Sequence, residues 1–248
     1  MNKVAIVAAT RTAIGSFQGA LSPLPATALG AAVIKALLER TGIDPAAGSS
    51  VLMGQVLTAG CGQNPARQSA IQAGLPVTTP AVTLNLVCGS GLQAIIEGAR
   101  AVALGDADVV IAGGQESMSN APYLMPGARA GLRAGHKQLQ DSMIQDGLWD
   151  AFNDYHMGIT AENLASRFNI SREQQDAFAL ASQQKAAAAL EAGRFGDEIT
   201  PLSVPAGRGK TRTVDTDEQP RTDTTAETLA ALRPAFIPGT GTVTAGNA

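Results

Sequence analysis

The sequence has few of the residues that several classes of protein require. It contains two cysteines and two histidines in 248 residues. Two thiols, Cys61 and Cys88, are too few for a disulfide framework and are typical of a reducing compartment. The histidines, His136 and His156, lie far from each other and from the cysteines, so the spacing of a metal site is missing. We therefore expect no metal site.

Positive charge and long apolar runs are also scarce. The formal net charge is −3, which argues against a general nucleic-acid binder because such proteins carry a basic excess. No segment approaches the ~18 apolar residues of a membrane span. The apolar run near the N-terminus is short and Arg11 follows it at once, whereas a signal peptide needs a longer run and a small-residue cleavage site. We expect a cytoplasmic protein without a nucleic-acid or membrane partner.

The first 116 residues alternate apolar, strand-like runs with helix-like segments. Four runs are expected to be strands: residues 4–9, 51–57, 82–87 and 108–112. Three segments between them are expected to be helices, with candidate N-caps at Thr27 and Asn64 and a third start after Cys88. Strands that are apolar throughout and separated by helices predict an α/β fold, with a mostly parallel sheet covered by helices on both faces.

The chain changes character after residue 116. Charged residues become more frequent and strand signals weaken. A helix is expected at about 156–168, and a clearer one begins at Ser171, where Gln174 completes a capping box. We expect residues 117–238 to form a helical insertion. Residues 239–248 begin like a returning strand, and the chain is expected to stop inside a domain.

Cys88 is the candidate nucleophile. It lies where an apolar run stops and a glycine-rich turn opens a helix. Unpaired N–H groups and the helix dipole at such a position favour the thiolate, and the flanking Gly89 and Gly91 leave room for a substrate. Cysteine is also a common core residue, so this placement alone leaves both interpretations open.

Other chemistries fit the same residues less well. The segment from Gly89 to Ala94 matches a Gly-x-Gly-x-x-Ala dinucleotide fingerprint, with Glu116 after the next strand, but one such fingerprint is weak. A Gly-x-Ser-x-Gly hydrolase motif is absent around Ser90. His156 stands at an expected helix entry, where a histidine is more often structural than a general base.

Seven motifs in order resemble the thiolase family, most closely its biosynthetic acetyl-CoA acetyltransferases. They are spread along nearly the whole chain, from residue 11 to residue 248. The motifs are RTAIGSF (11–17), GQNPARQ (62–68), NLVCGSG (85–91), AGGQESMS (112–119), YHMG (155–158), LRPAF (232–236) and GTVTAGNA (241–248).

The resemblance implies an acyltransferase that forms an acetyl-cysteine on Cys88. Two acetyl-CoA molecules would give acetoacetyl-CoA and CoA by Claisen condensation, with thiolysis as the reverse reaction. The Cys88 backbone N–H would contribute to an oxyanion hole. The thioester is a substrate, and no cofactor is expected.

The resemblance also assigns residues 1–116 to the nucleophile-bearing domain and residues 117–238 to a loop domain that binds CoA. It demotes His156 from general base to substrate contact. The expected CoA-contacting residues are Leu148, His156, Met157, Arg221, Thr228, Leu229, Leu232, Ala235, Phe236 and Ala245.

Full-length members of the family carry a second α/β domain with the activating histidine, an oxyanion-hole asparagine and a second cysteine. Those motifs do not occur in residues 1–248. We therefore expect a fragment that is inactive alone, and a homodimer or homotetramer for the full-length protein, through the segment Gly62–Gln68. The alternatives are a 3-oxoacyl-CoA or 3-oxoadipyl-CoA thiolase and a non-catalytic CoA-binding fragment. Cys61 is expected to be passive.

Overall fold

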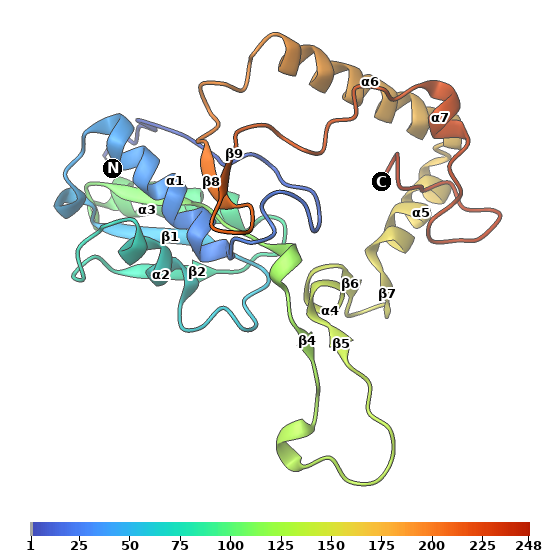
Figure 1. Ribbon diagram of the computed structural model, residues 1–248, viewed down its shortest axis with the longest axis horizontal. Helices are drawn as coiled ribbons and strands as arrows, with labels where there is room; N and C mark the ends of the chain where they lie inside the picture. Colours follow the sequence, from blue (N-terminus) through green and yellow to red (C-terminus); the bar gives the residue numbers. More distant parts are fainter. Residues whose placement is uncertain (1) are drawn as a thin grey trace. The chain divides into compact units, whose positions relative to one another are not determined.

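The computed structural model describes residues 2–248 and divides the chain into two compact units (Figure 1). The first, here called the sheet unit, comprises residues 1–147 and 198–218. The second, here called the helical unit, comprises residues 148–197 and 219–248. Each unit is described by itself.

A three-stranded parallel sheet organises the sheet unit. Its strand order is β2-β1-β3, with all neighbours parallel and with Gly54 in register with both Leu84 and Gly114. The carboxyl ends of the three strands therefore meet at one edge of the sheet, which is where parallel sheets bind ligands. The strands are β1 (Ser50–Gly54), β2 (Ala81–Leu84) and β3 (Val110–Gly114).

Helices lie against both faces of this sheet. Ile111 faces a buried cluster with Ile34 and Ala66 from two helices, whereas its neighbours Val110 and Ala112 face Gly98 of a third. Side chains alternate between the faces of a strand, so the third helix covers the opposite face. These helices are α1 (Ala26–Thr41), α2 (Pro65–Gln72) and α3 (Ser90–Leu104).

Local sequence explains most of these helix ends. The Asn64 side chain accepts the Arg67 N–H and Pro65 occupies the first position of α2, as expected. Gly42 closes α1 in the left-handed conformation, also as expected. Thr27 is not the N-cap of α1, because the helix begins one residue earlier, after Pro25.

The expected first strand, residues 4–9, is not a strand in the structure. Val4, Ile6 and Val7 are 44%, 79% and 74% exposed, and this blue segment of Figure 1 carries no strand arrow. Single hydrogen bonds hold its two ends: the Asn2 N–H donates to the Ala103 carbonyl, and the Arg40 side chain donates to the Ala9 carbonyl. A strand needs a partner for its backbone groups, and none is present for this segment among residues 2–248.

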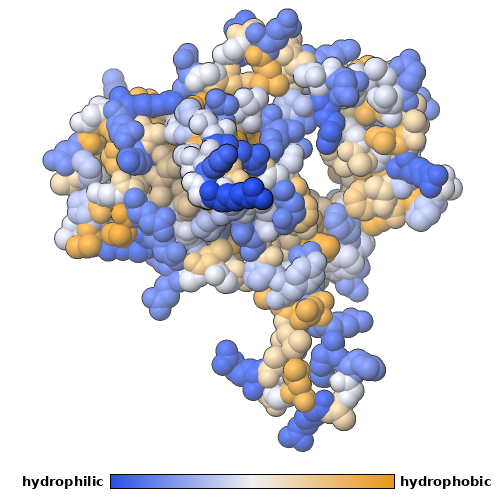
Figure 2. Space-filling model, in the orientation of Figure 1, coloured by the Kyte–Doolittle hydropathy of each residue, from blue (hydrophilic) through white to orange (hydrophobic). Residues whose placement is uncertain are grey.

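The rest of the sheet unit consists of short ribbons and turns. The segment from residue 125 to residue 140 is exposed throughout, and it connects the two strands of the first ribbon. Figure 2 shows apolar patches interspersed with polar surface on the face in view. The elements are η1 (Pro45–Ala47), η2 (Met118–Asn120), β4 (Tyr123–Leu124), η3 (Ala128–Ala130), β5 (Gln140–Asp141), α4 (Ser142–Gly147), β8 (Leu202–Pro205) and β9 (Thr211–Val214).

The helical unit contains three helices and one short ribbon. The expected capping box of Ser171 and Gln174 opens its longest helix. His156 precedes the first helix as its N-cap. The elements are β6 (Trp149–Asp150), β7 (Tyr155–His156), α5 (Met157–Phe168), α6 (Arg172–Glu191) and α7 (Ala226–Ala230). Among residues 2–248, no helix is long and apolar enough to span a membrane.

Candidate active site

Cys88 lies in a tight turn between β2 and α3. β2 ends at Leu84, earlier than the expected Val87, and α3 begins at Ser90. The Gly89 N–H donates to the Leu86 carbonyl over 3.0 Å and closes the turn. The turn therefore presents Cys88 between the strand end and the helix start, as the sequence predicts.

The backbone of this turn is strained. Val87 has a φ of 48°, in the left-handed region that β-branched residues rarely adopt. The Asn85 side chain accepts the Val87 N–H over 2.8 Å. Such outliers persist only where surrounding contacts hold them, so the contacts around this turn must keep Val87 in the left-handed conformation.

Cys88 itself is exposed. Its backbone N–H donates no hydrogen bond within the described residues. An exposed sulfur next to an unused N–H donor is the combination that acyl transfer requires, since the donor can bind the oxygen that becomes charged.

Glycines let the start of α3 lie directly on the sheet. A Cβ on Gly54 of β1 would collide with the Ser90 carbonyl carbon and would lie 2.6 Å from the Gly91 nitrogen. Gly91 in turn approaches Gly114 of β3, where an added Cβ would lie 3.6 Å from the Gly114 Cα. That distance is an ordinary van der Waals contact, so the close packing accounts for Gly54 and not for Gly91.

Buried polar groups join the carboxyl ends of β1 and β3. Gln115 donates to the Gln55 side chain over 2.9 Å, and Gln55 is 1% exposed. Glu116 accepts the N–H groups of Val56 and Leu57 over 2.8 and 3.1 Å. Burial raises the pKa of Glu116, and the two N–H donors oppose that rise. This network holds the β1 end beside the turn of Cys88.

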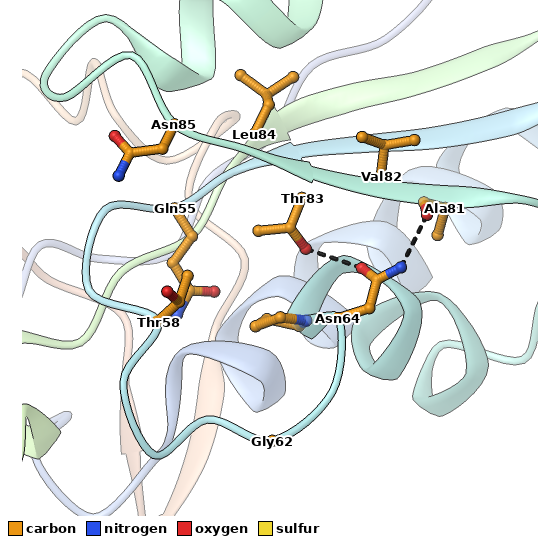
Figure 3. A pocket seen from close by; sticks show the side chains of 10 residues that line it. Gln55, Thr58, Gly62, Asn64, Ala81, Val82, Thr83, Leu84 and Asn85 are labelled. Atoms are coloured by element: carbon orange, nitrogen blue, oxygen red, sulfur yellow. Dashed lines mark hydrogen bonds between the residues drawn. The ribbon is translucent and has the colours of Figure 1, made fainter.

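A groove of about 610 Å³ opens along β2 (Figure 3). Asn64 lies on its wall, donating to the Ala81 carbonyl over 2.9 Å and accepting from the Thr83 hydroxyl over 2.8 Å. Asn85 and Gln55 line it where the strands end. The groove therefore begins at the strand ends near the Cys88 turn and follows the free edge of β2.

In the helical unit, His156 stacks on Phe236. The ring centroids are 4.9 Å apart, and the His156 Nδ1 accepts the Gly158 N–H over 3.0 Å. An accepting Nδ1 leaves the proton of the neutral ring on Nε2. The expected substrate contacts His156 and Phe236 are thus brought together by the structure.

Other expected CoA contacts gather around the C-terminal loop of the helical unit. A Cβ on Gly246, next to Ala245, would lie 2.5 Å from Leu232 Cδ1 and 2.7 Å from Leu229 Cδ2. The Ala235 N–H donates to the Val243 carbonyl over 2.9 Å.

The remaining expected contacts occupy three other places. Met157 donates its N–H to the Leu148 carbonyl over 2.8 Å, which joins these two residues beside β7. Thr228 belongs to the capping box that opens α7. The Arg221 N–H donates to the Gln183 side chain of α6 over 2.7 Å.

Carboxylates that the sequence analysis missed hold this C-terminal loop. Glu162 of α5 is 7% exposed and accepts the N–H groups of Thr242 and Val243, each over 2.9 Å at its shortest. Burial raises the pKa of Glu162, but these donors and the Thr242 hydroxyl together lower it below 4.5. Asp176 accepts from the Asn247 side chain over 2.8 Å.

Arg172 completes this arrangement. Its Nε donates to Asp176 over 2.8 Å, and its Nη2 donates to the carbonyls of Leu229 and Leu232 over 2.7 and 3.0 Å. One ion pair thus fixes both the loop, through Asn247, and the end of α7. Glu162 lies on the buried stripe of α5 together with Gly158 and Ala165. Its helical spacing from these two small residues is the signal that the sequence contained.

Comparison with known proteins identifies the family. Residues 4–248 match the family described as Thiolase, N-terminal domain. The chain belongs to the thiolase family. The expectation drawn from the seven motifs is therefore confirmed.

Several bacterial proteins are similar to this thiolase chain along nearly its whole length. It is 67% identical to an acetyl-CoA acetyltransferase of Pseudomonas aeruginosa, over all of this chain and 63% of the relative. It is 63% identical to an acetyl-CoA acetyltransferase of Chromobacterium violaceum, over 99% of this chain and 62% of the relative. It is 58% identical to a probable acetyl-CoA acetyltransferase of Escherichia coli, over all of this chain and 63% of the relative. The thiolase chain thus spans somewhat less than two thirds of these relatives' length.

Proposed function

We propose that this chain carries the nucleophile and the CoA-binding residues of an acetyl-CoA C-acetyltransferase. The observation that carries the proposal is Cys88, an exposed thiol with an unused backbone N–H in a strained turn. The names of the relatives support the same reaction.

The proposed chemistry has two acyl-transfer steps. The Cys88 sulfur attacks the carbonyl of acetyl-CoA, the bond from that carbon to the CoA sulfur breaks, and CoA leaves as a thiol after taking a proton. A second acetyl-CoA, deprotonated at its methyl carbon, then attacks the acetyl-cysteine. The carbanion forms a bond to the acetyl carbon, the bond from that carbon to the Cys88 sulfur breaks, and the products are acetoacetyl-CoA and the Cys88 thiolate. The proton lost by the methyl carbon is balanced when this thiolate takes up a proton.

We also propose roles for the helical unit. His156, Phe236 and the loop around Ala245 would contact CoA, supported by the stacked rings and by the anchored loop. That the full-length protein forms a homodimer or homotetramer, and that this chain alone does not turn over substrate, are also proposals. Both rest on the family resemblance.

Peptide mass spectrometry after incubation with acetyl-CoA tests the proposal. We expect an acetyl group on Cys88 and not on Cys61, which is half-buried and accepts from Gln55. Cys61→Ala is expected to keep the modification and Cys88→Ala to lose it. Protection of Cys88 from iodoacetamide by CoA is a second readout that needs no turnover. Equal labelling of both cysteines, without protection by CoA, would contradict the proposal.

A further inference from the structure

Ser90 connects the start of α3 to the turn that carries Cys88. It is 4% exposed. Its Oγ donates to the Val87 carbonyl over 2.6 Å and accepts the Leu86 N–H over 2.8 Å. The Ser90 N–H also donates to the Val87 carbonyl, over 3.1 Å. One residue therefore holds the Val87 carbonyl from two sides.

The held carbonyl belongs to the same peptide unit as the Cys88 N–H. A peptide bond is planar and almost always trans, so its carbonyl and its N–H point in opposite directions. Fixing the Val87 carbonyl on Ser90 therefore fixes the direction of the Cys88 N–H. That N–H has no acceptor within the described part of the chain.

The position of Ser90 is itself fixed by close packing. Gly54 leaves no room for a side chain between β1 and the Ser90 main chain. Ser90 therefore packs directly against β1, and its two bonds hold the carbonyl of Val87, whose φ is 48°. A left-handed valine persists only where surrounding contacts hold it, and these two bonds are among those contacts.

We propose that Ser90 is a positioning residue whose hydroxyl orients the Cys88 backbone N–H toward the oxygen that becomes charged during acyl transfer. The inference rests on the proposed function of Cys88. It assigns to Ser90 no contact with substrate. Its action is through the Val87–Cys88 peptide alone.

Two reactions of the same thiol separate this role from a general structural one. With p-nitrophenyl acetate, the Cys88 sulfur attacks the ester carbonyl, an oxyanion forms, and the bond to nitrophenolate breaks. With iodoacetamide, the sulfur displaces iodide at a saturated carbon and no oxyanion forms. Only the first reaction uses the N–H donor, so the ratio of the two rates at Cys88 reports on the oxyanion site.

The experiment measures both rates by peptide mass spectrometry on the 248-residue chain, with Cys61 as an internal reference. Ser90→Ala and Ser90→Gly are expected to slow acylation of Cys88 about tenfold and to change its alkylation by less than about twofold. Ser90→Thr, which keeps a hydroxyl, is expected to restore most of the acylation rate. Ser142→Ala is the matched control, because Ser142 is a buried serine of the same unit whose hydroxyl donates to the Pro122 carbonyl and makes no bond in the Cys88 turn. It is expected to change both rates at Cys88 by less than about twofold.

Each outcome decides the question. Selective loss of acylation in Ser90→Ala or Ser90→Gly, with rescue by Ser90→Thr, supports the proposal. Unchanged acylation overturns it. An equal fall in the acylation rate and the alkylation rate, at Cys88 and at Cys61 alike, also overturns it, because it would show a merely structural role. If wild-type Cys88 is acylated no faster than Cys61, the proposed function fails as well. If Cys88 is favoured but Ser90 has no effect, only the role of Ser90 fails.

Discussion

The two units hold their functional loops with different kinds of group. In the sheet unit, neutral hydrogen bonds from Ser90 and the close packing at Gly54 hold the turn of Cys88. In the helical unit, the carboxylates of Glu162 and Asp176 hold the C-terminal loop. The pKa of Glu162 is lowered, so this anchor loses its stabilising contribution as the pH falls through the lowered value, whereas a serine hydroxyl has no such transition. Acid should therefore loosen the second loop before it disturbs the first.

Glu116 and Glu162 show how burial and hydrogen bonds together set the pKa of a carboxylate. Glu116 accepts two backbone N–H groups and its pKa is raised, because burial outweighs those bonds. Glu162 accepts two backbone N–H groups and the Thr242 hydroxyl, and its pKa is lowered. In Glu116 burial outweighs the donors, whereas in Glu162 the three donors together outweigh burial. Glu162 is therefore an anchor in its charged form, whereas Glu116 is more easily held neutral.

The largest expected effect on the free energy of unfolding comes from replacing glycine by alanine where another segment packs against the glycine, at one position in each unit. Gly54→Ala sets a Cβ against the Ser90 main chain, which cannot yield without moving α3 from the sheet. Gly158→Ala sets a Cβ against the ring of Phe236, a half-buried side chain that can swing aside by rotation about its Cα–Cβ bond. We expect Gly54→Ala to lower the free energy of unfolding by about 3 kcal/mol and Gly158→Ala by about 1 kcal/mol.

Urea unfolding checks this pair of variants unit by unit. The single tryptophan, Trp149, reports on the helical unit, and the exposure of Cys61 to thiol reagents reports on the sheet unit. Gly113→Ala is the matched control, since its added Cβ would meet nothing within 4 Å. An effect of Gly54→Ala no larger than that of Gly113→Ala would contradict the close packing.

Replacing each of the two carboxylates by an amide should change the stability of the two units by different amounts. Glu162→Gln is expected to destabilise the helical unit by about 2 kcal/mol at pH 7, because bonds to a charged acceptor are lost. Glu116→Gln is expected to change the sheet unit by less than about 1 kcal/mol, since it also removes a buried charge. Trp149 fluorescence and Cys61 labelling in urea measure the two effects.

The pH dependence has opposite signs for the two residues. The lowered pKa of Glu162 gives stability that is present above its ordinary value of 4.5 and is lost as pH falls through the lowered value. The raised pKa of Glu116 favours the folded state below 4.5, and that contribution is lost as pH rises through the raised value. The cost of Glu162→Gln should therefore fade in acid. A cost that is constant from pH 7 to pH 3 would refute the assignment.

Features encoded by neighbouring residues could be predicted from the sequence. The caps at Asn64 and Ser171 and the turn before α3 depend on residues a few positions apart, and the structure contains them. The apolar run of residues 4–9 was a wrong prediction, because strand formation depends on a partner that no local pattern supplies.

Features that join distant residues could not be predicted in the same way. The bond between Gln55 and Gln115 spans 60 positions, and that between Glu162 and Val243 spans 81. On α5 the apolar residues Leu164 and Phe168 are exposed, while Glu162 occupies the buried stripe. The buried stripe of α5 therefore does not follow its large apolar residues, because one buried position is occupied by Glu162, a hydrogen-bonded anchor.

The smallest expected effect compares one left-handed residue in each unit. Val87 before Cys88 and Asn169 at the end of α5 have φ values of 48° and 53°. Asparagine tolerates this conformation, whereas a β-branched residue does so only under strain. Val87→Gly is expected to raise the free energy of unfolding by about 0.5 kcal/mol, since relief of strain exceeds the entropy cost of glycine. Asn169→Gly should change it by less than about 0.3 kcal/mol.

The control for this comparison is Val87→Ala, which keeps a Cβ and most of the strain and should give less gain than Val87→Gly. Urea unfolding followed by Cys61 labelling for the sheet unit and by Trp149 fluorescence for the helical unit measures all three variants. If Val87→Gly destabilises the sheet unit more than Asn169→Gly destabilises the helical unit, the strain is not located at Val87. The turn of Cys88 would then be held by its hydrogen bonds without opposing strain, and Ser90 would have less to hold in place.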